Sequence, residues 1–242
     1  LHRVDRRQRQ MCIRDSWKRG PLNLAPISQR ELGEVMPTKL VIGDYKKSSW
    51  SFRAWLVLVT ADVSFETLQV KLEQDDTRQQ ILRYSPSGKV PALLLDKVVI
   101  NDSLAICEYV AGAYPAANLW PQDPLVKAQA RAAAAEMHSG FVNLRTQMSF
   151  GLNTGDTPEP LTADTQEEIQ RIFDIWTNLR HASGSKQFLC GDFGIVDAMF
   201  VPVVFRFRRY GVAVPAQLQA YVEQVLAYPP VQKWLKLAAE EV

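Results

Sequence analysis

The hydrophobic periodicity of this chain changes at a group of prolines between residues 115 and 124. Before them, apolar runs of strand length alternate with amphipathic stretches, which predicts a small α/β unit. We expect strands at residues 39–44, 66–70, 92–95 and 98–101, and helices at 51–61, 76–84 and 103–114. The strand-helix-strand opening fits a right-handed crossover, and the short step through Asp96 and Lys97 fits a hairpin.

After the prolines only a helical period remains. We expect helices at residues 125–150, 162–184, 197–210, 215–227 and 231–241. The first part has the β-α-β-α-β-β-α order of a thioredoxin-like domain, and the second is all-α. We therefore predict a non-domain extension at residues 1–37, a thioredoxin-like α/β domain at 38–116, a linker at 117–124, and an all-helical domain at 125–242.

Composition limits the kinds of partner. The chain has 242 residues, 47% of them hydrophobic and 22% charged, which is enough to bury a core. Residues 1–35 hold 8 Lys and Arg against 4 Asp and Glu and carry +4, whereas the rest holds 20 against 22 and carries −2. The main body is thus close to neutral, and we expect neither a nucleic acid nor an anionic membrane as its partner.

Three further expectations concern disulfide bonds and metals, membrane-spanning segments, and the N-terminal segment. Cys12, Cys107 and Cys190 lie far apart, with no histidine at metal-ligand spacing, so we expect neither a disulfide framework nor a metal site. No stretch has the roughly 18 consecutive apolar residues that span a bilayer, so we expect a cytoplasmic protein. Residues 7–15 resemble translated sequencing-adapter read-through, and Met36 resembles a natural start, so the preceding segment is left out of the functional argument.

The chemistry begins with Ser-Ser-Trp-Ser-Phe-Arg at residues 48–53, where the first strand leads into a helix. Unpaired N–H groups and the positive end of the dipole at a helix N-terminus stabilise an anion. Hydroxyl groups at this turn suit a thiolate, but the turn itself has no cysteine. The thiol would therefore belong to a ligand, which indicates glutathione.

Three more motifs follow in order: Gly-Lys-Val-Pro-Ala-Leu at residues 88–93, Asn-Asp-Ser-Leu-Ala-Ile at 101–106, and Gly-Asp-Phe-Gly-Ile-Val-Asp-Ala at 191–198. With the first motif and the helical second half, they make residues 39–242 resemble a cytosolic glutathione transferase. The opening is similar to the serine-type, zeta-like bacterial members. The resemblance implies glutathione as co-substrate, a small apolar electrophile and a homodimer.

The resemblance places the thiol-activating hydroxyl at Ser48 or Ser49. Counting back from Arg53, the zeta-like pattern favours Ser48 and the theta- and delta-like pattern favours Ser49. We lean to Ser49, which stands nearer the first free N–H groups of the helix. Trp50, expected to contact glutathione, replaces the cysteine of the zeta motif, which argues against isomerase activity of that class. A serine-rich helix cap without catalysis is the structural alternative.

The second and third motifs supply the expected glutathione contacts. A cis Val90–Pro91 bond would present the Val90 backbone to the cysteinyl part of the ligand, beside Lys89, whereas a trans proline would merely open a strand. Ser103 is expected to cap its helix and to bind the γ-glutamyl carboxylate. Asp102 is placed for the α-amine, although the family usually has the longer Glu.

Other polar residues are assigned to structure rather than chemistry. Asp197 fits a capping box at the start of a buried helix. His138, in the middle of a helix, is expected to pack rather than to act as a base. Basic side chains at residues 206, 208 and 209 are expected to form a solvated helix end.

The electrophile site and the function have stated alternatives. Apolar side chains of one helix, together with Trp50, could line a pocket over the thiolate or pack in the core; they are Met137, Phe141, Met148 and Phe150. We predict a glutathione transferase. An isomerase of the maleylacetoacetate isomerase type would need a cation-lined pocket. A non-catalytic binding module would be marked by loss of the activating hydroxyl, and here two serines remain.

Overall fold

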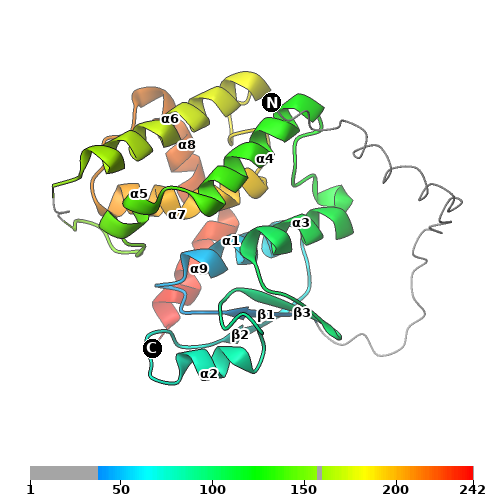
Figure 1. Ribbon diagram of the computed structural model, residues 1–242. Helices are drawn as coiled ribbons and strands as arrows, with labels where there is room; N and C mark the ends of the chain where they lie inside the picture. The colour runs from blue at the N-terminus through cyan, green and yellow to red at the C-terminus, as the bar shows by residue number, and fades with distance from the viewer. Residues whose placement is uncertain (1–37, 157–159, 242) are drawn as a thin grey trace, which may run out of the picture. The chain divides into compact units, whose positions relative to one another are not determined.

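The computed structural model describes residues 38–156 and 160–241 (Figure 1). These residues belong to one compact unit, Met36–Val242. The expectations for residues 1–37 lie outside the described part of the chain. The division of this unit into an α/β domain that ends at residue 116 and a helical domain that begins at residue 125 stays a prediction.

In the described ranges, four strands form one sheet in the order β2-β1-β3-β4. They are β1 (Lys39–Ile42), β2 (Glu66–Gln69), β3 (Ala92–Leu95) and β4 (Val98–Ile100). Strand β1 runs parallel to β2 and antiparallel to β3, with Leu40 opposite Leu93. Strands β3 and β4 form the predicted hairpin, whose turn holds Asp96 at a φ of 48°.

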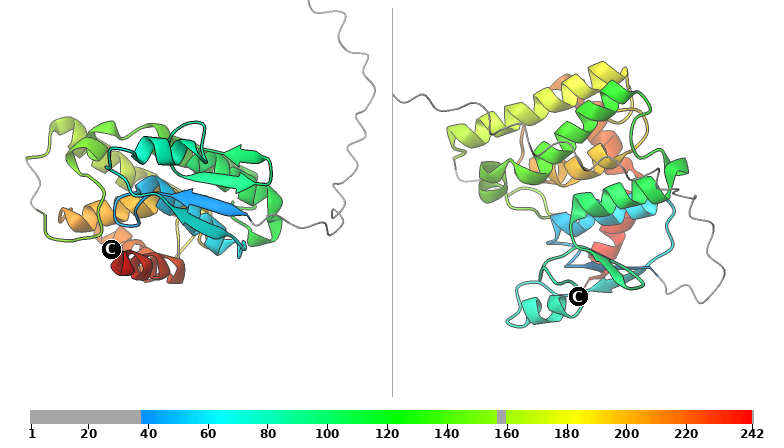
Figure 2. Two further views of the ribbon diagram at one scale, coloured as in Figure 1. Left: turned by 90° about the horizontal axis from the view of Figure 1, so that it is seen from below. Right: turned by 45° about the vertical axis from the view of Figure 1, so that its right-hand side comes forward.

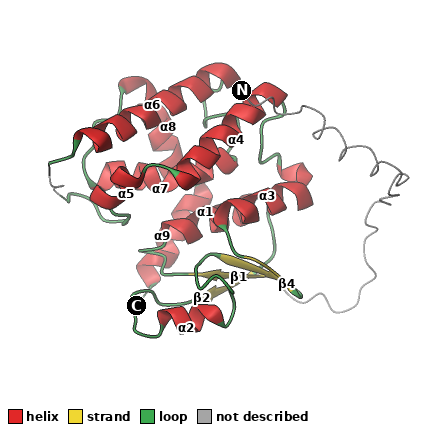
Figure 3. Cartoon of the chain, in the orientation of Figure 1, coloured by secondary structure: helices red, strands yellow, loops and turns green. Residues whose placement is uncertain are grey.

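Both faces of the sheet are covered by helices. Because side chains alternate along a strand, Leu40 and Ile42 face the main core, whereas Val41 joins a smaller cluster with Val70 and Ile81. Helices α1 (Ser49–Thr60) and α3 (Ser103–Ala113) pack together over the main core, and α2 (Thr77–Leu82) covers the other face (Figure 3). The thioredoxin-like order is confirmed.

The second half of the described chain is helical, as predicted. After the 3-10 turn η1 (Pro115–Ala117) come α4 (Pro124–Ser139), α5 (Val142–Gln147), α6 (Ala163–Ser183), α7 (Ile195–Arg209), α8 (Ala216–Ala227) and α9 (Pro229–Glu240). Helix α7 is buried on every side from Ile195 to Phe207 and packs against α1 and α4 (Figure 2). It therefore connects the sheet-bearing half to the helical half.

One predicted helix is wrong. Residues 125–150 form two helices, because the chain breaks at Gly140 and Phe141. Gly140 has extended backbone, and Phe141 adopts a left-handed conformation with a φ of 57°. A Cβ at Gly140 would lie only 2.9 Å from the carbonyl oxygen of Glu136, so a glycine suits this tight exit from α4. The other predicted elements begin and end within two residues of the observed ones.

None of the helices in the described ranges is long and apolar enough to cross a membrane.

Candidate functional site

The turn from β1 into α1 holds both predicted thiol-activating serines, and they have different surroundings. Ser48 is the N-cap of α1, and its hydroxyl accepts the Ser51 N–H at 3.2 Å and donates to the Ser51 hydroxyl at 2.7 Å. The Ser51 hydroxyl in turn accepts the N–H of Gly43 at 3.1 Å. The Ser48 hydroxyl is thus part of the network that fixes the turn.

Ser49 is the first residue of α1 and is 7% exposed. No residue of the described chain gives its hydroxyl a hydrogen-bond partner. Of the two serines, Ser49 is therefore the one with a hydroxyl free to donate to a ligand. Which serine activates a thiol stays a prediction.

All six predicted binding residues line one pocket of about 260 Å³. The pocket is formed by Trp50, Lys89, Val90, Pro91, Asn101, Asp102, Ser103 and His138. The Val90–Pro91 bond is cis and not trans, as the glutathione-binding interpretation of this motif requires. Asn101 and His138 are the lining residues that the sequence argument did not assign to the site.

The start of α3 corrects the predicted cap. Asp102, not Ser103, is the N-cap, and its Oδ1 accepts the N–H groups of Leu104 and Ala105, both at 2.9 Å. An aspartate before the helix has an acceptor that reaches two first-turn N–H groups, so it satisfies the cap better than a serine inside the helix. The Ser103 hydroxyl is left buried with no partner in the described chain, and Ser103 is one of the residues that line the pocket.

His138 reaches the pocket from the far side, at the end of α4. Its Nε2 lies 3.0 Å from Oδ2 of Asp102, and its ring packs edge-on against Trp50 with centroids 5.3 Å apart. Its Nδ1 is buried without a partner in the described residues. His138 therefore packs at the junction of the two halves, as expected, but it also lines the pocket.

The predicted solvated basic end of α7 is wrong for Arg206. Its side chain is 5% exposed and donates through Nε to the carbonyl of Met148 at 2.8 Å. Burial, followed by the charge of Arg145, lowers the pKa of Arg206 to about 10. Helix α7 crosses the centre of the fold, so its last turn is still covered by the segment after α5. Arg208 is exposed, as expected.

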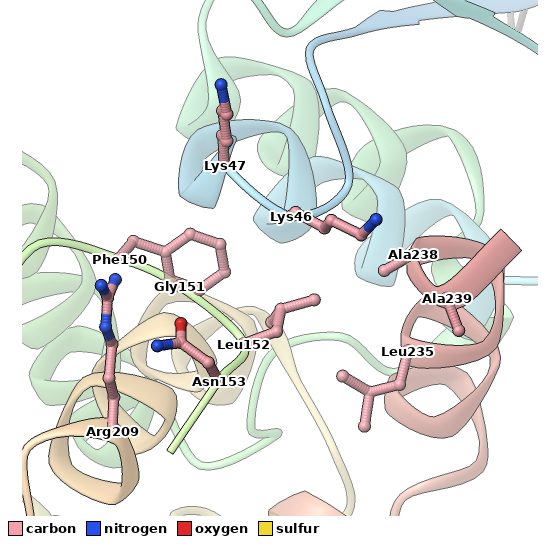
Figure 4. Close-up of a pocket in the computed structure, with 10 residues that line it drawn as sticks. All are labelled: Lys46, Lys47, Phe150, Gly151, Leu152, Asn153, Arg209, Leu235, Ala238 and Ala239. Carbon is pink, nitrogen blue, oxygen red and sulfur yellow. The ribbon is translucent and has the colours of Figure 1, made fainter. Parts of the chain in front are cut away.

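A second pocket of about 520 Å³ lies beside the loop that precedes α1. Figure 4 shows Phe150, Leu152 and Leu235 around the same space, with Lys46 and Lys47 on the loop and Arg209 on α7. Each cation has an acidic or carbonyl partner: Lys46 donates to the carbonyl of Glu241, Lys47 pairs with Glu73, and Arg209 pairs with Asp156. The pocket is therefore apolar at its centre and basic at its rim.

The predicted apolar lining is only partly correct. Phe150 lines this second pocket, but Met137, Phe141 and Met148 are core residues.

Asp197 has the structural role that was expected. It lies in the first turn of α7, is fully buried, and accepts the N–H groups of Leu189 and Gly194, each at 3.0 Å. It closes the turn that leads into α7 and does not line the pocket at the start of α3.

Comparisons with known proteins place the chain. Residues 47–113 match the family model for the glutathione S-transferase N-terminal domain, and residues 159–237 match that for the C-terminal domain. A probable maleylacetoacetate isomerase of Caenorhabditis elegans is 35% identical over 173 residues, which is 71% of this chain and 80% of that protein. One of Vibrio cholerae is 29% identical over 180 residues, covering 71% and 82%.

Among solved structures, a glutathione transferase homologue from Burkholderia with bound glutathione has a TM-score of 0.64 and 26% identity, covering 84% of this chain and 98% of that one. A Tau class glutathione S-transferase from mango has a TM-score of 0.67 at 21% identity, covering 84% and 96%, and it supports the fold alone. The two family models match in the expected order, and the nematode relative exceeds 30% identity over most of its length. The chain therefore belongs to the glutathione S-transferase family.

Proposed function

We propose that this protein binds glutathione in the pocket at the start of α3 and activates its thiol for attack on an electrophile. The observation that carries the proposal is the Ser103 hydroxyl, which is buried and unpartnered in the described chain and belongs to a residue that lines that pocket. Asp102 accepts two N–H groups of the first turn, and within the described residues the Ser103 N–H has no hydrogen-bond partner. A carboxylate such as that of the γ-glutamyl group suits this donor pair.

The middle of the peptide would pair with Val90, which precedes β3 and lines the same pocket. Recognition by strand addition takes place at the edge or end of a strand, and Val90 stands two residues before the start of β3. Asp102 is proposed for the α-amine of the ligand, with His138 as a neighbour that holds Oδ2 of the carboxylate. The Burkholderia structure with bound glutathione supports a ligand of this kind.

The thiol would lie near Trp50, beside the Ser49 hydroxyl. A thiol with a pKa of about 8.5 is roughly 3% ionised at pH 7, and lowering that pKa to about 6.5 makes it about 75% ionised. Because nucleophilicity falls as basicity falls, the net gain is only a few-fold. Most of the rate is therefore expected from orientation of the thiolate against the electrophile.

The second pocket, beside Phe150 and Leu152, is proposed as the electrophile site. Its apolar centre favours the transfer of glutathione to an apolar electrophile. Its basic rim also suits a substrate with carboxylates, and several curated relatives are named maleylacetoacetate isomerase. Isomerisation of a cis double bond in a dicarboxylate is therefore the second candidate function. Parallel assays with an apolar aryl halide and with maleylacetoacetate would separate the two.

A homodimer and a cytoplasmic location complete the proposal. Large apolar side chains are exposed on β4, α3 and α4, namely Val98, Tyr109 and Leu125. These elements offer a surface for a second copy, and light scattering would measure the mass in solution. Cys107 and Cys190 are free thiols, which suits a reducing compartment such as the cytoplasm.

Thermal denaturation with glutathione tests the binding step. Ligand at about 100 times its Kd should stabilise the folded protein by roughly 2.7 kcal/mol. Ser103→Ala should weaken that shift, whereas Ser139→Ala should not, because the Ser139 hydroxyl is exposed and bonds only within α4. No shift with the native chain would favour the non-catalytic binding module instead.

A further inference from the structure

Three arginines from three helices lie close together inside the fold, and in the described part of the chain none of them forms an ion pair with a carboxylate. They are Arg53 on α1, Arg145 on α5 and Arg206 on α7, and we refer to them as the arginine cluster. Arg53 is 1% exposed, Arg206 is 5% exposed, and Arg145 is half-buried. Within the described residues, none of the ion pairs includes any of the three.

The hydrogen bonds of the arginine cluster satisfy only part of it. Nε of Arg53 donates to the carbonyl of Met199 at 3.0 Å, and Arg145 donates to the carbonyl of His138 at 3.3 Å. Both terminal nitrogens of Arg53 and Nε of Arg145 are buried without a partner in the described chain. A guanidinium stays charged in proteins, and a buried charge without a partner is strongly unfavourable.

An aromatic ring compensates a further part of this charge. The guanidinium carbons of Arg53 and Arg145 lie 4.4 and 4.7 Å from the centroid of the Trp50 ring. Such contacts are worth about 0.5–2 kcal/mol each, less than the removal of a cation from water costs. Burial and mutual repulsion lower the pKa of Arg53 well below its usual range. The arginine cluster therefore keeps a positive potential that none of the ion pairs in the described residues neutralises.

The arginine cluster lies behind the walls of both pockets. Trp50 lines the pocket at the start of α3, and Phe150 lines the second pocket. The guanidinium carbon of Arg206 lies 5.7 Å from the centroid of the Phe150 ring. Ser49 and Arg53 are four residues apart on one helix, so their Cβ atoms are about 5–6 Å apart. The charged and titratable groups facing the cluster from neighbouring elements are Cys107, Glu168, Arg209 and Tyr210.

We infer that the arginine cluster supplies the counter-charge for the thiolate of glutathione, acting through the Trp50 wall while a serine hydroxyl donates to the sulfur directly. This inference rests on the proposed function. The S–H bond breaks, its electron pair stays on sulfur, and the proton goes to solvent water. In a buried site of low polarity, such fixed positive charge stabilises an anion more than it would in water.

Removing and restoring one charge tests the inference. In the complex with saturating glutathione, the ultraviolet absorbance of the thiolate is titrated against pH. Arg206→Gln should raise the midpoint by about one unit, whereas Arg206→Lys should keep it near the native value, because it keeps the charge. Arg208→Gln is the matched control, since it removes the same charge from an exposed position of α7, and it should leave the midpoint unchanged.

A second variant and a second ligand separate the possible failures. If Arg206→Gln does not fold, Arg145→Gln, on the half-buried member of the arginine cluster, gives the same test. S-methylglutathione has no thiol proton, so its affinity should change little in either variant. If the native chain binds neither ligand, the proposed function fails. If it binds both, and the charge-removing variants leave the midpoint where it was, the role of the arginine cluster is refuted while the proposed function stands.

Discussion

The two serines at the start of α1 should respond differently to removal of their hydroxyl groups. In the structure the Ser48 hydroxyl both accepts and donates within the turn, whereas the Ser49 hydroxyl is free of the described residues. Ser48→Ala should therefore affect stability, and Ser49→Ala should affect the bound thiol. The sequence alone left the choice between them open.

The size of each effect follows from its type of hydrogen bond. Loss of an N-cap hydroxyl costs about 1 kcal/mol, which for a domain of this size lowers Tm by roughly 2–4 °C. A hydrogen bond to an anion is worth about 1.5–3 kcal/mol, so its loss should raise the pKa of bound glutathione by roughly one to two units. Affinity for glutathione should stay within a few-fold, because the hydroxyl bonds the thiolate far more than the thiol.

Two measurements on each variant decide the matter: a thermal melt without ligand, and a titration of thiolate absorbance with glutathione bound. Ser49→Thr, which keeps a hydroxyl, should preserve the native midpoint. A raised midpoint in Ser48→Ala but not in Ser49→Ala would assign the role to Ser48 and refute the argument from free hydroxyls. If the double variant also titrated like the native protein, the activating group would lie outside this turn.

Two further predictions concern the surroundings of the site. The Glu241 carboxylate accepts the N–H groups of Tyr45 at 2.8 Å and Lys46 at 3.1 Å, and these bonds hold the loop before α1. Glu241→Gln should therefore loosen that loop, lower Tm by a few degrees and reduce kcat/KM. The control Glu240→Gln should leave both Tm and kcat/KM unchanged. Burial raises the pKa of Asp197 to about 7 from an unfolded value of about 3.9, so the folded state holds an extra proton in that interval. The free energy of unfolding should then fall as pH rises from about 4 to 7, and an equal slope in Asp197→Asn would contradict this.

Most of the fold could be predicted because its signals are local. The alternation of Leu40, Val41 and Ile42 is visible within one strand, and the two faces of the sheet bury the residues that this alternation separates. The break in the helix at residues 125–150 could not be predicted, because Gly140 lies in a pattern that remains helical on either side. The helix ends where Gly140 leaves the helical conformation after donating to the Glu136 carbonyl, and Phe141 follows with a left-handed φ of 57°, which is uncommon for a residue other than glycine.

The residues of the candidate site also fall into those that local motifs predict and those that only the tertiary fold brings together. Trp50, Val90 and Ser103 belong to short motifs whose residues stay together in the fold, so the sequence identified them. His138 and Arg206 come from helices of the second half. Their spacing indicates which residues share a helical face, but not what that face meets. The expectation of a solvated Arg206 was wrong because a helix through the centre of the fold buries even its basic end.

The two helix starts at the site share one arrangement, and it has a consequence for mutation. Ser48 caps α1 and Ser49 follows it, and Asp102 caps α3 and Ser103 follows it. In each pair the first residue caps the helix, and the hydroxyl of the second has no partner in the described chain; of these two hydroxyls, that of Ser103 is fully buried. A buried hydroxyl without a partner is unfavourable, so a ligand that bonds Ser103 offsets that cost, and a bond to Ser49 adds a second contact. Stability and binding are thus carried by neighbouring residues, and substitutions one position apart should separate them.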